Sequence, residues 1–197
     1  GLDLEPETIN TYEIIMEQYI TGQIFGTING FYYQINDLIT LVTDPEDDIL
    51  VFRNVDEINA MGIEFGLEGR ITAGIKGRIS YAFVETEDKA TGDVLTNSPK
   101  HLAKLNVITP IVENRLYVAG EAQYLSERMT LAGNYTEDFV VMNLNLSTQL
   151  FDSHVRASVG VFNLFDEKYF DPASEEHTQE LIQQNGRTYR ASLTLTY

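Results

Sequence analysis

Long stretches of alternating apolar and polar residues constrain the fold of this chain more than any other feature of its sequence. The alternation is clearest over residues 188–197, where every second residue is apolar or aromatic and the others are hydroxylic or basic. The same period recurs over residues 154–161 and 140–147. A period of two places successive side chains on opposite faces of a β-strand. The chain is therefore predicted to form strands with one apolar and one polar face.

Applied to the whole sequence, the pattern predicts about nine antiparallel strands. Their expected ranges are 8–20, 24–36 or 24–43, 58–72, 75–88, 101–112, 115–130, 138–150, 154–166 and 186–197. Most of them run to about 12 residues, whereas strands of globular proteins commonly have about 5–6. One short helical turn is expected at 178–184, within a loop. We therefore predict an all-β fold made of an antiparallel up-and-down sheet.

The connections between the predicted strands alternate between short and long. The short ones lie near residues 21–23, 73–75, 112–114 and 151–153, and the long ones cover about 44–57, 89–100, 131–137 and 167–185. In an up-and-down sheet this order places every tight turn at one end and every long loop at the other. Outer-membrane barrels have the same asymmetry, with short periplasmic turns and longer extracellular loops.

Charge and composition exclude several classes of function. The chain has 13 Lys+Arg and 30 Asp+Glu, a net charge of −17, which argues against nucleic-acid binding because phosphates require a basic surface. It has no cysteine, so thiol nucleophiles, disulfides and cysteine-ligated metals are impossible. Its three histidines lack zinc-type spacing, and no G-x-S-x-G nucleophile motif occurs. We therefore predict no enzymatic activity, no cofactor and no resident metal.

Two acidic loop segments carry side chains that could bind cations. Residues 44–48 offer several oxygen ligands for calcium but lack the glycine and the distal glutamate of an EF-hand. Glu175, Glu176 and His177 lie together in the last long loop. Because charged runs are usually solvated, we expect solvated loops at both places.

Two architectures can accommodate these strands. A soluble β-sandwich would bury the apolar faces between two packed sheets. A transmembrane barrel would turn them to lipid and close on itself, so that every backbone group is paired. Strand length and the one-sided long loops favour the barrel. In a sandwich, by contrast, Leu144, Val159, Leu193 and Leu195 would meet in a dry interior.

In a barrel, the polar face would line the lumen and meet water, a passing ligand or a protein that fills the barrel. The candidate ligand-binding residues on this face are Glu64, Glu68, Arg70, Lys104, Glu121, Gln123, Arg156 and Arg190. Asn106, Asn143 and Asn145 are expected beside them. Most of these side chains should simply hydrate the lumen, because selectivity residues are a minority of a lumen wall.

The predicted strand number raises a question of closure, since nine is odd and bacterial barrels have an even number of strands. Either the count is off by one, or the chain is the C-terminal piece of a larger barrel. Residues 1–6 lack the basic and apolar regions of a signal peptide, which favours the second interpretation.

Five short motifs occur in one order along the chain. They are Leu4-Glu5-Pro6-Glu7 with Tyr12-Glu13, N-A-M-G-I-E at 59–64, N-S-P-K-H at 97–101, N-L-F-D-E-K-Y at 163–169 and Q-N-G-R-T-Y at 184–189. Together they resemble the barrel of TonB-dependent outer-membrane receptors over essentially the whole chain. Within them, Gly62 and Gly186 are expected where a side chain would obstruct the backbone. Asn163 is expected to satisfy backbone groups where strand pairing ends.

The resemblance implies a barrel of about 22 strands with a plugged lumen. Such a receptor imports a metal chelate, such as a ferric siderophore, with energy that the TonB complex delivers from the inner membrane. We expect residues 1–197 to be the C-terminal portion of this barrel, with the plug domain and the earlier strands absent from the chain.

The resemblance also implies the location and partners of the protein. The location would be the bacterial outer membrane. The partners would be the TonB complex, the plug domain, lipid and lipopolysaccharide, the barrel-insertion machinery and a small ligand. Tyr197 matches the terminal aromatic residue that serves as the family's assembly signal. The alternative function is that of a soluble or surface-exposed β-rich ligand-binding module without transport.

Overall fold

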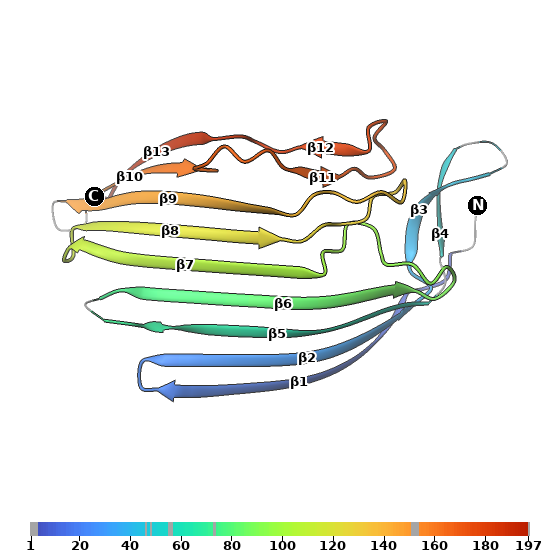
Figure 1. Cartoon of the computed structure of the whole chain (residues 1–197), viewed down its shortest axis with the longest axis horizontal. Helices are drawn as coiled ribbons and strands as arrows, with labels where there is room; N and C mark the ends of the chain where they lie inside the picture. The colour runs from blue at the N-terminus through green and yellow to red at the C-terminus, as the bar shows by residue number, and fades with distance from the viewer. Residues whose placement is uncertain are drawn as a thin grey trace.

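The structure, a computed structural model, describes residues 4–45, 47, 49–54, 57–72, 74–150 and 154–196. Its main element is a nine-stranded sheet in the order β1-β2-β5-β6-β7-β8-β9-β10-β13 (Figure 1). The strands are β1 (Thr8–Thr21), β2 (Ile24–Asn36), β5 (Ile58–Arg70), β6 (Lys76–Asp88), β7 (His101–Val112), β8 (Leu116–Leu125), β9 (Phe139–Leu150), β10 (Val155–Phe162) and β13 (Thr188–Leu195). All neighbours in this sheet are antiparallel. The predicted all-β, up-and-down sheet of nine strands is thus confirmed.

Two small hairpins lie in the long loops and were not predicted. β3 (Ile39–Thr43) pairs with β4 (Leu50–Asn54), and β11 (Phe170–Pro172) pairs with β12 (Leu181–Gln183). The segment to residue 43 is therefore not a continuation of β2, because the chain turns at Asp37, which has a φ of 57°.

Three other predicted element boundaries are wrong. The helical turn expected at 178–184 is absent, since β12 lies there and its backbone groups are paired with β11. The strand predicted to reach residue 130 ends at Leu125, and the one predicted to reach residue 166 ends at Phe162. Positive φ angles at Asn163 and Asp166 explain the second early end. Over the described ranges the chain forms no helix that could cross a membrane.

The short and long connections lie at opposite ends of the sheet (Figure 1). At the tight-turn end, the hydroxyl of Thr21 accepts hydrogen bonds from the amides of Gln23 and Ile24 at 3.2 and 3.1 Å. Asn114 has a φ of 58° in the turn that Arg115 closes by donating its amide to the Val112 carbonyl at 3.0 Å. Residues 151–153, the fourth predicted tight turn, lie outside the described residues.

The apolar face of the sheet is open to its surroundings. Leu144, Val159, Leu193 and Leu195 are 43%, 56%, 66% and 64% exposed. In the described part of the chain, the other sheets are only the two hairpins, so no second layer covers this face. The sandwich architecture is therefore wrong. An apolar surface of this extent indicates contact with a membrane or another protein.

The few buried side chains lie toward the loop end of the sheet instead. Among the described residues they are Ile58, Leu125, Ser126, Arg128, Thr130, Thr136, Phe139, Asn163, Pro172 and Ala173. Several are polar, so hydrogen bonding as well as apolar packing orders this end.

Gly62, in the middle of β5, lies where a side chain would obstruct the sheet, as predicted. A Cβ atom there would overlap the carbonyl oxygen of Phe83 on the neighbouring strand and approach Cζ of Phe31 to 2.7 Å. Gly30, in the adjacent β2, has nothing within 4 Å of the same position. The backbone of β6 cannot move away from Gly62 without disturbing strand pairing.

Substitution of Gly62→Ala should therefore destabilise the intact protein by about 1–3 kcal/mol, the usual cost of overpacking. Urea unfolding followed by tyrosine fluorescence measures this change. Gly30→Ala is the matched control and should leave the unfolding midpoint nearly unchanged. Equal midpoints for the two variants would contradict the steric role of Gly62.

Candidate functional site

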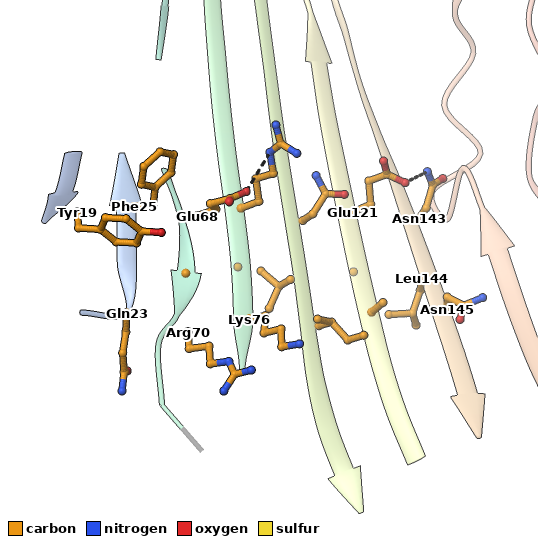
Figure 2. Close-up of a pocket in the computed structure, with 18 of the residues that line it drawn as sticks. Tyr19, Gln23, Phe25, Glu68, Arg70, Lys76, Glu121, Asn143, Leu144 and Asn145 are labelled. Atoms are coloured by element: carbon orange, nitrogen blue, oxygen red, sulfur yellow. Dashed lines mark hydrogen bonds and ion pairs between the residues drawn. The ribbon is translucent and has the colours of Figure 1, made fainter. Parts of the chain in front are cut away.

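A shallow cavity of about 960 Å³ lies on the polar face, toward the tight-turn end of the sheet (Figure 2). Eight strands, β1, β2 and β5 to β10, contribute to its lining, from Tyr19 in β1 to Phe162 in β10. Tyr19 and Phe25 close one side as a tilted ring pair with centroids 5.0 Å apart. The cavity is therefore a trough across the sheet and not a pocket between two elements.

A row of polar side chains crosses this trough, with one side chain on each of five successive neighbouring strands. This polar row consists of Glu68, Arg78, Asn106, Glu121 and Asn143, whose Cα atoms are paired in that order. Arg78 Nε lies 3.9 Å from Glu68 Oε2, and Asn143 Nδ2 donates to Glu121 Oε2 at 3.0 Å (Figure 2). Both carboxylates of the row thus have partners within it.

A second row runs nearer the tight turns and includes positively charged side chains. Its register positions are, in order, Arg70, Lys76, Ile108, Ala119, Asn145, Gly160 and Arg190, and we call it the basic row. Among the described residues, Arg70 and Lys76 have no ion pair or side-chain hydrogen bond. The guanidinium of Arg190 lies 5.2 Å from the ring centroid of Phe162. The basic row therefore presents positive charge without a matching carboxylate.

The strand register places all eight predicted ligand-binding candidates on this polar face. Glu68, Arg70 and Glu121 line the cavity, as do Asn106, Asn143 and Asn145. Lys104 and Gln123 are Cα partners outside it, and Arg156 pairs with Thr194 near the end of the sheet. Glu64 lies toward the loops and accepts a hydrogen bond from Asn29 Nδ2 at 3.4 Å. Their ligand-binding role stays a prediction.

Several residues of the cavity lining were not predicted, among them the aromatic residues Tyr19 and Phe25 and the basic residues Lys76 and Arg78. The alternation in β6 could have identified Lys76 and Arg78, because both occupy the same face as Ser80 and Ala82. Tyr19 and Phe25 carry no such signal, since aromatic residues occur on both faces of these strands.

A second polar cluster orders the loop end, with Arg128 at its centre. Arg128 is only 5% exposed. Its Nη1 donates to Asn97 Oδ1 at 3.0 Å, and its Nη2 donates to the Phe170 carbonyl at 2.9 Å and to Asp171 Oδ1 at 2.7 Å. Asn97 belongs to the β6–β7 loop and Asp171 to the β10–β13 loop. One guanidinium therefore ties three long loops together.

Glu180 makes a further tie between two of these loops. Its Oε1 accepts hydrogen bonds from the Thr130 hydroxyl at 2.5 Å and from Asn134 Nδ2 at 2.9 Å. These two hydrogen bonds stabilise the carboxylate and lower the pKa of Glu180. In the same region, burial raises the pKa of the Tyr169 hydroxyl, and the nearby Asp171 raises it further.

Asn163 satisfies backbone groups where β10 ends, as predicted. Its Nδ2 donates to the carbonyls of Glu167 at 2.8 Å and Asn185 at 3.2 Å, and its Oδ1 accepts from the Glu167 amide at 2.8 Å. Asp166 Oδ1 accepts from the Arg187 amide at 2.7 Å, and a Cβ on Gly186 would approach that oxygen to 2.6 Å. The two C-terminal motifs therefore bind each other across the last loop.

The acidic loops show no metal centre in the part of the chain that the structure describes, where no three potential ligands converge. Glu46 and Asp48 of the first acidic loop lie outside the described residues, as does Tyr197. In that loop Asp44 forms an ion pair with Arg53 of β4. Lys89, which follows β6, has its pKa raised by a hydrogen bond to Glu87 at 2.6 Å.

Comparison with known proteins gives one family match. Residues 1–164 match the family model described as TonB dependent receptor-like, beta-barrel. None of the curated proteins compared with the sequence matches it.

Solved structures resemble the fold at low sequence identity. The copper transporter OprC superposes with a TM-score of 0.81 at 19% identity, over 98% of this chain and 32% of that one. A variant of the ferric enterobactin receptor PfeA from Pseudomonas aeruginosa gives 0.78 at 18%, over 97% and 31%. The siderophore receptor PirA from Acinetobacter baumannii gives 0.77 at 17%, over 99% and 32%. The chain thus spans about a third of the length of each.

Replacing the central arginine of the loop cluster should loosen three loops at once. Arg128→Met keeps the side-chain length but removes every guanidinium hydrogen bond, so the free energy of local opening should fall by about 1–3 kcal/mol. Hydrogen exchange at residues 89–100, 126–138 and 163–187 measures the change. Arg53→Met, the control in the β3–β4 hairpin, should affect only that hairpin. Faster exchange confined to residues 126–138 in Arg128→Met would contradict the three-loop tie.

Acidification should weaken the tie made by Glu180. Because the folded-state pKa of Glu180 lies below its ordinary value of about 4.5, its contribution to stability is complete above that pH and is lost as the pH falls through the folded-state pKa. Limited proteolysis of the last loop with pepsin, between pH 5 and about 3, should therefore accelerate with acid. Glu180→Gln lacks this titration, so its cleavage rate should change less. An identical pH profile for the two proteins would refute the role of Glu180.

Proposed function

The chain belongs to the TonB-dependent receptor family, as part of its β-barrel, and from this membership we propose that the protein is an outer-membrane importer of a metal chelate, such as a ferric siderophore. The proposal depends chiefly on the nine-stranded meander whose exposed apolar face lies opposite a polar one. In water, such an apolar face would cause protein molecules to associate, whereas in a bilayer it would contact the lipid chains.

The strands have the length that a bilayer requires. β5 and β6 have 13 residues each and β7 has 12, and a tilted transmembrane strand needs about 9–11. Further strands would close the sheet and pair the outer edges of β1 and β13. In a closed barrel no unpaired backbone group is exposed to lipid. Residues 1–197 are proposed to be the C-terminal portion of that barrel.

The two ends of the sheet support an orientation in the membrane. Short turns characterise the periplasmic end of outer-membrane barrels, and long loops the extracellular end. We accordingly assign the Arg128 cluster and both hairpins to the cell exterior. The TonB complex and a plug domain are the proposed partners inside, together with lipid, lipopolysaccharide and the barrel-insertion machinery, which would recognise Tyr197.

The charge of the loops bears on the ligand. Acidic side chains dominate the long loops, including Asp88, Asp93, Glu175, Glu176 and Glu180. They would disfavour highly anionic ferric chelates and favour neutral or cationic ones, although salt screens such effects beyond about 10 Å. Two structural neighbours, a copper transporter and a siderophore receptor, support a metal-containing cargo.

Growth under iron limitation tests the proposal. A strain that lacks the intact receptor should lose growth on at least one ferric chelate from a panel of neutral, cationic and anionic siderophores. Complementation should restore growth only when TonB is present. The receptor should also migrate in a heat-modifiable manner, as folded barrels do. Uptake of no chelate, with the protein isolated as a monomer without detergent, would favour the soluble binding module instead.

A further inference from the structure

A furrow of about 940 Å³ crosses the apolar face of the sheet over β1, β2, β5 and β6. Gly30 lies at its middle, between its Cα partners Ile14 and Ile63, both of which are exposed. A Cβ atom on Gly30 would have nothing within 4 Å, so the missing side chain leaves a recess in this face. We call this feature the apolar furrow. The other side chains of the same face that line it are Tyr12, Tyr32, Met61, Phe83 and Glu85.

A second cavity, of about 460 Å³, continues the furrow toward the long loops. Tyr32, Met61 and Glu85 line both cavities, so the two are contiguous. We call the second one the charged cavity, because its lining includes Glu85, Glu87, Lys89, Lys100 and Glu127. The lining thus changes from apolar to charged along one continuous path. A ligand that follows this path must be an amphiphile.

The charged cavity has the position expected of a membrane interface. On the lipid face of a barrel, a charged side chain is costly at the bilayer centre and nearly neutral at the interface. Glu85 lies on the same face of β6 as Phe83, because their Cα partners Met61 and Ile63 share one face of β5. Lys100 Nζ lies 5.3 Å from the ring centroid of Phe83, on this face as well. In the proposed barrel, the furrow would therefore lie beside acyl chains and the charged cavity beside head groups.

The charges of this cavity match a head group that carries both signs. Lys100 Nζ lies 2.5 Å from Glu85 Oε1, and Lys89 Nζ lies 2.6 Å from Glu87 Oε2. Each lysine ammonium has three N–H donors, so two remain for phosphate oxygens. Glu127 forms no ion pair with the described residues, which leaves its carboxylate for a cation. A purely anionic head group would instead meet an excess of carboxylates over ammonium groups.

We propose that the apolar furrow and the charged cavity together bind one phospholipid with a zwitterionic head group, such as phosphatidylethanolamine. One acyl chain lies over Gly30, the phosphate accepts hydrogen bonds from Lys89 and Lys100, and the ammonium group pairs with Glu127. This inference rests on the proposed function, because it requires that the apolar face meets a bilayer. It assigns one class of lipid to one place on the barrel wall.

Filling the furrow tests the acyl-chain part of the site. The intact receptor in detergent is incubated with equimolar phosphatidylethanolamine and phosphatidylglycerol of identical acyl chains, separated from free lipid and analysed by mass spectrometry. The wild type should retain phosphatidylethanolamine in preference. Gly30→Leu should lower this retention several-fold, because the new side chain occupies the recess. Ala122→Leu adds apolar volume to the same face of β8, between Leu105 and Met142 and outside the furrow, and should retain the wild-type amount.

Neutral substitutions in the charged cavity test the head-group part. Lys89→Met with Lys100→Met should lower the retention of both lipids several-fold, because both carry a phosphate. Lys168→Met with Arg187→Met removes the same charge from the last loop, outside both cavities, and should have no effect. Glu127→Gln should keep lipid bound but abolish the preference for phosphatidylethanolamine, since only that lipid carries an ammonium group.

The possible outcomes separate this inference from the proposed function. Wild-type retention by Gly30→Leu would overturn the lipid site while leaving chelate uptake intact. Equal retention of the two lipids by the wild type, or preferential retention of lipopolysaccharide added as a third competitor, would also overturn it. If Gly30→Leu does not fold, Gly30→Val should give a smaller loss of retained lipid, and no loss would count against the site. A wild-type receptor that does not insert into bilayers would refute the proposed function itself.

Discussion

Backbone pairing between neighbouring strands is the constraint on which the rest of this structure depends. Because side chains alternate with a period of two, a slip of one residue in any pair would move a whole strand's polar side chains to the opposite face. The register instead aligns Glu68, Arg78, Asn106 and Glu121 across four strands. Tight turns such as those at Thr21 and Asn114 hold this register by shortening the path between strands. The polar row and the basic row are both consequences of it.

The sheet lacks the interior that stabilises most globular domains. Its apolar side chains are exposed, and the buried side chains among those described gather at the loop end. There, Arg128 and Glu180 join segments that no strand pairing connects. Lipid would cover the apolar side chains of the strands, as a hydrophobic core does in a globular domain. The loops depend instead on hydrogen bonds and a few apolar contacts. The two ends of the molecule are thus ordered by different forces.

The distribution of charge follows the same division. Carboxylates dominate the long loops, whereas Arg70, Lys76, Arg78 and Arg190 lie on the polar face toward the tight turns. The acidic loops and the basic side chains of the polar face therefore form two separate surfaces of opposite charge.

The sequence by itself determined the nine strands, their faces and the alternation of turns and loops, because a strand's period is a local property of consecutive residues. It also identified Asn163 and Gly62 through short motifs. Only the tertiary structure decided that Arg128 would meet Asn97, Phe170 and Asp171, which lie 31, 42 and 43 residues away in the chain. The same holds for the β11–β12 hairpin, where a helical turn was expected, and for the alignment of Arg70 with Arg190 on one row. Such neighbours depend on the pairing of distant segments, and no local period encodes that pairing.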